Sequence, residues 1–282
     1  MNMEVKNLEN IDLEKLVAVI NLSFSDYIVP LQLNLEILKA KIKAEDIKME
    51  LSMGVFDGDE MLGCMLHGLR DTEEGLTVYN GATGVIPSHR GRGLVRKMYE
   101  HLLPELKKLE VKNMVLEVIT GNHPAIKAYE KMGYTVHRTL DCYRGKIQVN
   151  NNSPVSILKE IDPVEWKELM SFWDTKPSWQ NAVQSLENSK ENCQFVAAYR
   201  DDLLVGYAVY NPTSRKINQL AVAKNYRNKG IGTELFAHIN EVVDQQEVFV
   251  FNVDHNAAST LEFLKAQGLC EHIAQFEMSR MV

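Results

Sequence analysis

The residues best suited to chemistry lie in two short loops that resemble each other. Residues 88–94 read SHRGRGL and residues 225–231 read NYRNKGI, and each loop precedes the pattern of an amphipathic helix. Free backbone amides and the helix dipole attract anions to the N-terminus of a helix, most naturally phosphate. Gly93 and Gly230 have no Cβ atom, so a pyrophosphate could approach the main chain there. Further positive charge is available from four loop side chains: Arg90, Arg92, Arg227 and Lys229.

Neither loop matches a common nucleotide-binding motif. The Walker A sequence G-x-x-x-x-G-K-[ST] and the dinucleotide fingerprint G-x-G-x-x-G are both absent from the chain. A single R-x-x-G sequence carries little information, because an ordinary polar helix start has the same composition. Two copies in matching strand–loop–helix settings favour anion binding over that alternative.

The two loops are part of a longer internal repeat. Arg90 and Arg227 are 137 positions apart, and the segments around them match. Three pairs of segments correspond in the same order: 23–30 with 171–178, 83–106 with 220–243, and 122–134 with 256–269. This order indicates a duplication. A length of 282 residues suits two domains of ordinary size.

Each copy has the pattern of an α/β unit. The helix expected over 91–109 carries Leu94, Met98, Leu102 and Leu106 on one face. In the first copy, strands are expected near 3–8, 51–57, 60–69, 77–87, 114–120 and from 134, and further helices near 10–22, 34–43 and 123–132. A crossover helix between the central strands predicts parallel pairing within a mixed sheet.

The second copy is expected to repeat this order after a linker. Residues 148–154 read QVNNNSP, a composition typical of a loop between domains. The sequence therefore predicts an N-terminal domain over 1–148 and a C-terminal domain over 154–282.

Composition and charge exclude several classes of protein. The net charge is −7, and neither half has the basic excess of a protein that binds nucleic-acid backbone. No apolar run approaches the roughly 20 residues that cross a bilayer, and the N-terminus does not resemble a signal peptide. We therefore expect a cytoplasmic protein without membrane partners. The four cysteines are far apart with no C-x-x-C pair, so no metal site is expected.

The order of these motifs resembles the GNAT family of N-acetyltransferases. The family pattern V-x-x-x-x-[QR]-x-x-G-x-[GA] and a later Asn followed by A-x-x-x-Y-x-x-x-G-[FY] both occur. The residues that fit are Val85, Arg90 and Gly93, then Val222, Arg227, Gly230 and Gly232, and for the second pattern Asn122, Ala125, Tyr129, Gly133 and Tyr134. The resemblance covers nearly the whole chain as two consecutive GNAT folds, similar in arrangement to mycothiol synthase and other duplicated members.

The resemblance implies an acyl-CoA donor, usually acetyl-CoA, and no metal. In the family the loop amides hold the pyrophosphate, and the strand that ends at the Val position pairs with the pantetheine arm. The implied cofactor-binding residues are Val85, Arg90, Gly91, Arg92, Gly93, Leu94, Val95 and Asn122 in the first copy, and Val222, Arg227, Asn228, Lys229, Gly230, Ile231 and Gly232 in the second.

The resemblance also implies an acid and a base in the first copy. Glu117 and Tyr129 have a spacing that is similar to the ribosomal-protein alanine acetyltransferase branch, in which the Glu is the base and the Tyr the acid. The acceptor amine must lose a proton before it attacks, and the departing CoA thiolate must gain one. A carboxylate and a Tyr hydroxyl suit these two tasks.

The second copy lacks this pair, and two alignments of it remain open. Anchoring on Asn256 places Phe251 and Phe263 at the Glu and Tyr positions, whereas anchoring on Gly268 places Asn252 and Leu264 there. The C-terminal copy does have the complete loop, while the first has Val95 where the family prefers Gly or Ala. Side chains that could substitute are Tyr207, Tyr210, Asp254 and His255. We therefore expect catalysis in the N-terminal domain.

The resemblance also implies that the segment between the first two helices lines the acceptor pocket. There Phe24, Asp26 and Tyr27 offer an aromatic wall and a carboxylate that would suit an amine, although packing is an alternative role for such aromatic residues. The predicted reaction moves an acetyl group to a primary amine of a small molecule or peptide. The alternatives are a non-catalytic CoA-binding sensor or scaffold, or catalysis in the C-terminal domain.

Overall fold

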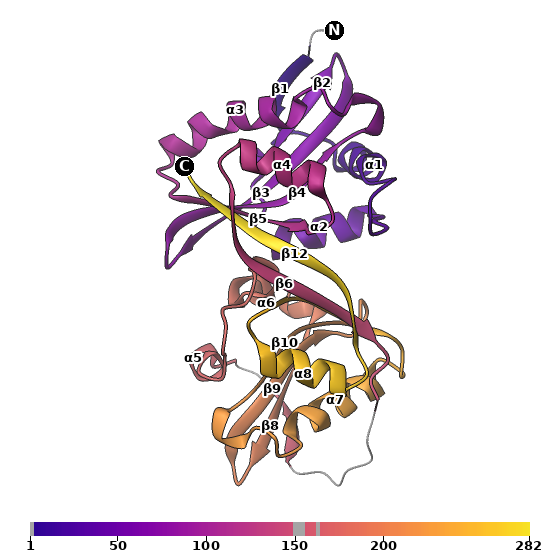
Figure 1. Cartoon of the computed structure of the whole chain (residues 1–282), viewed down its shortest axis with the longest axis vertical. Helices are drawn as coiled ribbons and strands as arrows, with labels where there is room; N and C mark the ends of the chain where they lie inside the picture. Colours follow the sequence, from indigo (N-terminus) through magenta and orange to yellow (C-terminus); the bar gives the residue numbers. More distant parts are fainter. Residues whose placement is uncertain (1–2, 149–155, 162–163) are drawn as a thin grey trace. The chain divides into compact units, whose positions relative to one another are not determined.

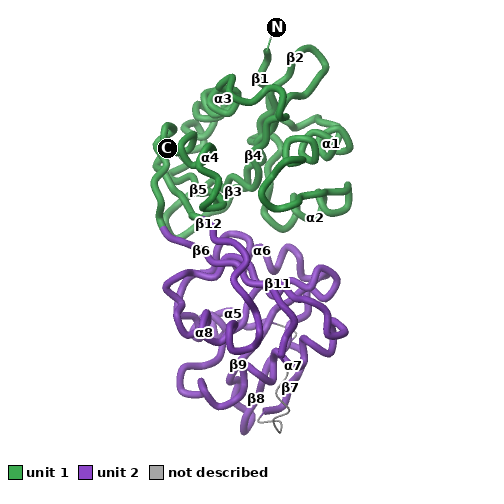
Figure 2. The backbone as a smooth tube through the Cα atoms, turned by 45° about the vertical axis from the view of Figure 1, so that its right-hand side comes forward, with its two compact units in different colours: residues 1–137, 276–282 green, residues 138–275 purple. Residues whose placement is uncertain are grey.

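A computed structural model describes residues 3–148, 156–161 and 164–282. The chain forms two compact units, which Figure 2 shows in different colours. Unit 1 comprises residues 1–137 and 276–282, and unit 2 comprises residues 138–275. Apart from Gln148, the predicted linker over 148–154 lies outside the described residues.

Unit 1 is a mixed sheet with helices between its strands (Figure 1). Its strand order is β1-β2-β3-β4-β5 followed by the last part of β12. Strands β4 and β5 form a parallel pair, which the crossover helix α3 joins. The elements are β1 (Met3–Asn7), α1 (Leu13–Ser23), α2 (Leu35–Ala44), β2 (Met53–Asp57), β3 (Glu60–Thr72), β4 (Gly75–Val85), α3 (Leu94–Lys108), β5 (Asn113–Ile119), α4 (His123–Lys131) and the start of β6 (Thr135–Gly145).

Unit 2 has the same order of strands around its own parallel pair, β10 and β11. The order is β6-β11-β10-β9-β8-β7, with β6 contributing from Arg138 onward. The elements are β7 (Ile157–Glu160), α5 (Trp166–Met170), α6 (Val183–Asn188), β8 (Gln194–Arg200), β9 (Leu203–Asn211), β10 (Lys216–Val222), α7 (Ile231–Val242), β11 (Val248–Asp254), α8 (Ala258–Ala266) and β12 (Cys270–Met281). The predicted fold class, two α/β units with mixed sheets, is confirmed.

Helices pack on both faces of the sheets because strand side chains alternate between faces. A Cβ atom at Gly84 of β4 would lie 2.7 Å from Cβ of Ser23 on α1. A Cβ atom at Gly206 of β9 would lie 2.9 Å from Cγ2 of Ile231 on α7. Glycine at these positions lets each helix approach its sheet closely.

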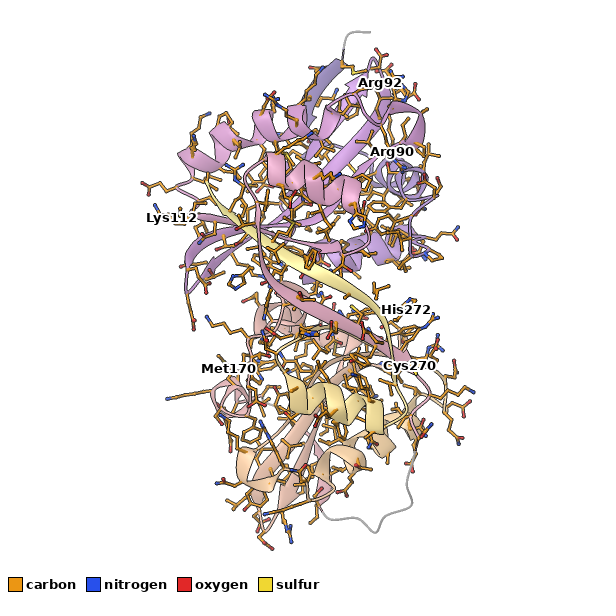
Figure 3. All side chains as sticks on the ribbon, in the orientation of Figure 1. Arg90, Arg92, Lys112, Met170, Cys270 and His272 are labelled. Atoms are coloured by element: carbon orange, nitrogen blue, oxygen red, sulfur yellow. The ribbon has the colours of Figure 1, made fainter. Side chains whose placement is uncertain are left out.

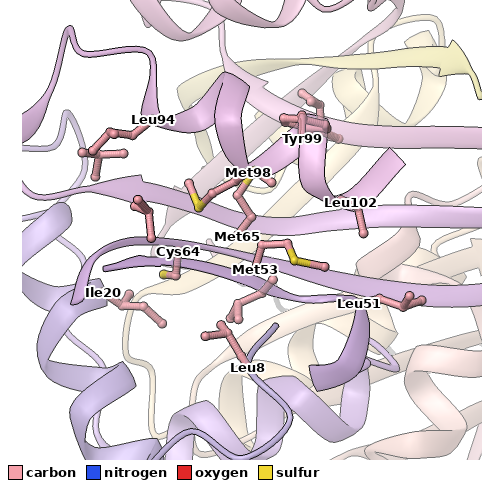
Figure 4. Close-up of a cluster of buried hydrophobic side chains, with 14 of the residues drawn as sticks. Leu8, Ile20, Leu51, Met53, Cys64, Met65, Leu94, Met98, Tyr99 and Leu102 are labelled. Carbon is pink, nitrogen blue, oxygen red and sulfur yellow. The ribbon is translucent and has the colours of Figure 1, made fainter. Parts of the chain in front are cut away.

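The core of unit 1 is formed by aliphatic and methionine side chains. In Figure 4, Leu94, Met98 and Leu102 of α3 point toward the strands that carry Met53 and Met65. These side chains are at most 2% exposed. The predicted apolar face of this helix therefore packs on the sheet, and its burial is the main favourable contribution to the stability of the unit.

Each unit contains part of a strand from the other copy of the sequence repeat. Residues from Phe276 onward belong to unit 1, where Met278 is fully buried and the Arg280 guanidinium donates to the carbonyl of Met132. Residues from Arg138 onward belong to unit 2, where Arg138 pairs with Asp254 at 3.1 Å. The predicted domains, 1–148 and 154–282, describe the two copies of the repeat and remain a proposal. The compact units have different bounds because residues 138–148 belong to unit 2 and residues 276–282 belong to unit 1.

The two parallel strands of each unit separate toward their carboxyl ends. In unit 1 the last parallel partners are Asn80 and Leu116, and a bulge at Gly81 follows on β4. In unit 2 the last partners are Ile217 and Val250, and the bulge lies at Asn218. A bulge bends its strand and increases the local twist, so both units open at the same place.

No helix within the described ranges is long and apolar enough to cross a membrane. Those ranges also hold no group of three or more His, Cys, Asp or Glu side chains placed to bind a metal ion.

Candidate functional site

The two glycine-containing loops have the same backbone conformation. Gly91 and Gly93 have φ of 74° and 72°, and Asn228 and Gly230 have φ of 58° and 89°. Glycine and asparagine are the residues that tolerate this left-handed region best. The loops deliver the chain into α3 and α7, whose first-turn amides have no acceptor within their own helix.

The arginines at the start of the loops hold the fold together locally. Arg90 Nε donates to the carbonyl of Val85 at 3.1 Å, and one terminal nitrogen donates to the carbonyl of Ser23 at 2.7 Å. Arg227 repeats this geometry with the carbonyls of Val222 and Phe172, at 3.0 and 2.9 Å. Each guanidinium therefore links the end of a strand, β4 or β10, to the chain at the end of α1 or just after α5.

Both arginines also pair with an aspartate. Arg90 binds Asp26 through two 2.7 Å hydrogen bonds, and Arg227 binds Asp174 at 2.7 Å. The hydrogen bond from Arg90 lowers the pKa of Asp26. Sequence reasoning proposed Arg90 for phosphate and Asp26 for the amine, whereas the structure brings these two side chains together. Arg92 and Lys229 are exposed at the helix start, where each donates a hydrogen bond to a backbone carbonyl of its own loop, and Figure 3 labels Arg90 and Arg92.

Glu117 lies on β5 where the parallel strands begin to separate. The hydroxyl of Tyr79 on β4 donates a hydrogen bond to its Oε2. The pKa of Glu117 is raised to about 7. Burial raises it most, the Tyr79 hydrogen bond lowers it, and the negative charges of Glu277 and Glu45 raise it. A carboxylate with a pKa near neutrality can exchange a proton with a substrate under ordinary conditions.

Tyr129 lies on α4 and is 9% exposed. Burial raises the pKa of its hydroxyl, which a hydrogen bond with Thr83 partly offsets. Asn80 donates from Nδ2 to Thr83 at 2.7 Å and to Tyr99 at 2.9 Å, and the Tyr99 hydroxyl lies 3.1 Å from that of Tyr134. A network of buried polar side chains therefore holds the environment of Tyr129.

Tyr27 connects the predicted acceptor segment to the predicted donor site. Its hydroxyl hydrogen-bonds with Asn122, and burial raises its pKa. Asn122 also caps α4 by accepting from the amide of Ala125 at 3.3 Å. Phe24 packs edge-to-face on Tyr27 with 5.0 Å between ring centroids. Tyr27 therefore lies beside Asn122 of the predicted donor site, and the ring of Phe24 packs against the ring of Tyr27.

A bulge in unit 2 explains why two alignments of the repeat compete. Val115 pairs with Tyr79 in unit 1, and Phe249 pairs with Lys216 in unit 2. Residues of β5 therefore correspond to residues of β11 that lie 134 positions later, so Phe251 takes the position of Glu117. Past a register shift between Val250 and Val253, the offset becomes 135. Asn252, with φ of 61°, lies within that shift.

After this bulge the helices correspond with the larger offset. The amide of Tyr134 donates to the carbonyl of Tyr129, and the amide of Leu269 donates to that of Leu264. Tyr129 therefore corresponds to Leu264. The strand therefore follows the alignment anchored on Asn256, and the helix follows the alignment anchored on Gly268. Unit 2 has neither the Glu nor the Tyr.

The whole polar network of unit 1 is apolar in unit 2. Five positions correspond by the offsets of 137 and 135. The pairs are Asn80 and Ile217, Thr83 and Leu220, Tyr99 and Phe236, Tyr129 and Leu264, and Tyr134 and Leu269. Unit 2 therefore lacks both a hydroxyl at the position of Tyr129 and the polar groups that surround it in unit 1.

Gly232 has a packing role in addition to its place in the motif. A Cβ atom there would lie 3.1 Å from the Phe263 ring, and that ring packs edge-to-face on Phe236 with 5.0 Å between centroids. In unit 1 the equivalent residue is Val95, which is partly buried against the core. The small residue therefore lets an aromatic pair form beside the loop of unit 2.

A cavity of about 710 Å³ lies within unit 2. At one end it is lined by the loop before α7, including Arg227, Asn228 and Gly230, and by α8. It continues between the separated strands, past Asn218 and Phe251. The cavity thus joins the candidate anion site to the opened sheet, as an elongated donor with a phosphate end requires.

Part of this cavity is lined by hydrogen-bonded neutral side chains. Trp173 Nε1 donates to the Tyr207 hydroxyl at 2.5 Å, and that hydroxyl donates to Gln219 at 2.7 Å. Asn181 accepts from Gln219 through its carbonyl at 2.6 Å. Where unit 1 has Glu45 beside Gly81, unit 2 has Asn181 beside Asn218. The carboxylate of Glu45 therefore has a neutral amide, that of Asn181, in its place in unit 2.

Sequence reasoning missed the side chains that surround Glu117. Tyr79 and Glu45 precede the motifs, and Glu277 lies near the end of the chain. The alternation of β4 could have placed Tyr79 on the face of Glu117, given the register. Nothing in the repeat places Glu277, because it follows the second copy in the sequence but belongs to unit 1 in the structure.

The family model described as the acetyltransferase (GNAT) family matches this chain twice, over residues 16–134 and 158–269. A tandem GNAT protein from the clavulanic acid biosynthesis pathway has a similar fold, with a TM-score of 0.73 and 14% identity. That comparison covers 99% of this chain and 98% of the other.

Two curated relatives are similar over part of their length. Mycothiol acetyltransferase of Corynebacterium glutamicum is 32% identical over 95 residues, 33% of this chain and 31% of the relative. N-alpha-acetyltransferase 30 of Schizosaccharomyces pombe is 26% identical over 96 residues, 33% of this chain and 63% of the relative. The matched stretches thus span less than two thirds of either relative.

Proposed function

Because the chain belongs to the acetyltransferase (GNAT) family and is an acyltransferase of tandem form, we propose that unit 1 transfers an acetyl group from acetyl-CoA to a primary amine. Glu117 is the general base and Tyr129 the general acid. The observation that carries this proposal is the surroundings of Glu117: burial and two neighbouring carboxylates bring its pKa to about 7, and Tyr79 holds it by a hydrogen bond.

The proposed reaction uses both side chains in order. Glu117 takes a proton from the ammonium group of the acceptor, directly or through water. The amine nitrogen then bonds to the thioester carbon, the C–S bond breaks, and the nitrogen releases its second proton to solvent. Tyr129, whose raised pKa keeps it protonated near neutrality, gives its proton to the sulfur. Transfer of the Glu117 proton to Tyr129 through solvent restores the site.

The donor substrate fits the residues of both loops. Left-handed residues at 91, 93, 228 and 230 leave the first helical amides open to an anion, and Arg92 and Lys229 add exposed charge beside them. In unit 2 the cavity extends from this loop to the opened sheet. We infer that acetyl-CoA binds with its pyrophosphate on these loops, and that bound donor supplies the thioester.

The cavity supports a second function for unit 2. It has the loop and the space for a CoA thioester, while Phe251 and Leu264 replace the base and the acid. We infer that unit 2 binds CoA without transferring the acyl group. Calorimetric titration of the chain with CoA then gives two binding events, and Gly230→Val removes one of them.

The acceptor is a small-molecule amine or a peptide amine. The partial likeness to mycothiol acetyltransferase favours the first, and that to N-alpha-acetyltransferase 30 favours the second. Thiol release from acetyl-CoA, measured with a panel of amino sugars, polyamines and peptides, distinguishes the two. If CoA binds but no amine in any class accelerates thiol release, the protein is a binding module.

Two variants test which unit is catalytic. Tyr129→Phe removes only the hydroxyl, and we expect kcat to fall by about 10² or more, as for loss of a general acid. Gly230→Val forces a branched residue into a left-handed position and should leave kcat within about threefold, with Gly230→Ala as the milder control. Activity that survives Tyr129→Phe and is lost in Gly230→Val, with the fold intact by circular dichroism, assigns catalysis to unit 2.

A further inference from the structure

We propose that Tyr79 and Glu277 are positioning residues that act on the Glu117 carboxylate in opposite senses: Tyr79 stabilises its charged form and Glu277 destabilises it. This inference deepens the proposed function, because it rests on Glu117 as the base. It assigns a role in the reaction to the last strand of the chain.

Tyr79 is placed by the sheet to hold Glu117. It lies on β4 opposite Val115, and Glu117 is two residues further along β5, on the same face as Val115. Tyr79 is 1% exposed, and its hydroxyl donates to Oε2 of the carboxylate. A hydrogen bond to a charged acceptor is stronger than one to a neutral acceptor, so it favours the ionised base and fixes its orientation.

Three other charged groups act on Glu117, from two elements. Glu45 and Lys41 come from α2 and its C-terminal end, and Glu277 comes from β12. Lys41 binds both carboxylate oxygens of Glu45 at 2.6 Å, so the charges of this pair largely offset each other. Glu277, 8% exposed, is the neighbouring charge that raises the pKa of Glu117 most. Tyr79 and Glu277 are therefore the two side chains with the largest opposing effects.

Unit 2 has lost the Tyr and the Glu together. Lys216 corresponds to Tyr79, and Phe251 corresponds to Glu117. The Lys216 ammonium lies 5.8 Å from the centroid of the Phe251 ring, a cation–π arrangement. A tyrosine that holds a carboxylate has no carboxylate to hold where the facing residue is phenylalanine. The replacement of both residues in unit 2 therefore agrees with a positioning role for Tyr79.

The position of Glu277 makes the site of unit 1 depend on the end of the chain. Residues 276–282 belong to unit 1, where Met278 lies in the same core as α3 and the amide of Val282 donates to the carbonyl of Lys112 at 3.1 Å. These contacts fix the last strand beside the first unit. Glu277 is thus held in place by packing and hydrogen bonds of its neighbours, as a positioning residue must be.

The test is the pH profile of kcat/KM for the acceptor amine, measured on the full chain with acetyl-CoA. We expect Tyr79→Phe to move the acid limb upward by about one to two pH units, because one charge-assisted hydrogen bond is lost. At a pH below the limb, this corresponds to a loss of about tenfold for each unit. Glu277→Gln moves the limb downward. Tyr143→Phe, which removes a hydroxyl that hydrogen-bonds with Lys265 in unit 2, is the matched control and leaves the limb in place.

The outcomes separate this inference from the function on which it rests. If Glu117→Gln retains activity, the proposed base is wrong. If Glu117→Gln is inactive while neither Tyr79→Phe nor Glu277→Gln moves the acid limb, the base stands and the positioning roles are wrong. Shifts of both variants in the same direction also contradict the inference. Carbon-13 NMR titration of the Glu117 carboxyl in each folded variant gives the same comparison without turnover.

Discussion

The raised pKa of Glu117 has a consequence for stability that needs no substrate. In the folded chain this pKa is about 7, compared with the ordinary 4.5 of the unfolded chain. The folded state therefore binds more protons than the unfolded state between these values. Stability is highest below about pH 4.5 with respect to this group and falls as pH rises toward 7, where the carboxylate must be charged in a partly buried position.

Glu117→Gln removes this dependence and little else. The Gln side-chain carbonyl still accepts the hydrogen bond from Tyr79, and the side chain has almost the same size. We expect the free energy of unfolding of the wild type to fall relative to that of Glu117→Gln by about 2.5 kcal/mol between pH 5 and pH 8, from the shift between the two pKa values. The variant should be inactive and, at pH 8, more stable.

Urea unfolding followed by far-UV circular dichroism at pH 5, 6, 7 and 8 measures this difference. Dichroism is preferable to tryptophan fluorescence because all three tryptophans, at 166, 173 and 179, lie in unit 2. Glu105→Gln on the exposed face of α3 is the control, and its difference from wild type should stay constant with pH. A difference between wild type and Glu117→Gln that is equally constant would refute the buried, protonated carboxyl.

Three further predictions concern the ends of the chain and the loops. Ending the chain at Gln275 removes the strand with buried Met278 and should lower the free energy of unfolding of unit 1 by more than about 3 kcal/mol, measured by urea denaturation. Arg90→Gln should cost about 1–2 kcal/mol of stability because two backbone carbonyls lose a donor, whereas Arg92→Gln should raise KM for acetyl-CoA and weaken its salt dependence. Gly232→Val should lower the melting temperature, because its side chain meets the Phe263 ring.

Much of the first unit could be predicted because its patterns are local. Apolar spacing predicted the helix over 91–109, and the observed α3 begins three residues later, at Leu94. The difference has a physical reason: Gly91 and Gly93 adopt left-handed conformations, which an α-helix cannot include. The second copy was harder. Its first helices are short, α5 and α6, and Pro177 in the segment between them cannot donate to a helix.

The site could be predicted where a motif determines the backbone conformation. It could be predicted less well where side chains pair with residues that are distant in the sequence. Both loops could be located from their glycines and basic residues, and the structure adds that each loop has two left-handed residues. It could not show that Arg90 would bind Asp26, because the two lie 64 positions apart and each has a plausible role alone. Nor could it place Glu277 near Glu117, since the exchange of strands between units leaves no periodic signal.

The bulge at Asn252 shows how a duplicated site can lose its chemistry without losing its fold. One extra residue in β11 shifts the following helix by one position in the alignment, yet Gly268 and Gly133 keep the same left-handed conformation. The sheet, the loop and the helices tolerate this change because their cores are apolar. Acid–base chemistry does not tolerate the accompanying replacements, because it needs a carboxylate on the strand and a hydroxyl on the helix. Selection for binding alone preserves the first set of features, and selection for transfer preserves both. The contrast between the two units therefore favours unit 1 as the place where the acetyl group moves.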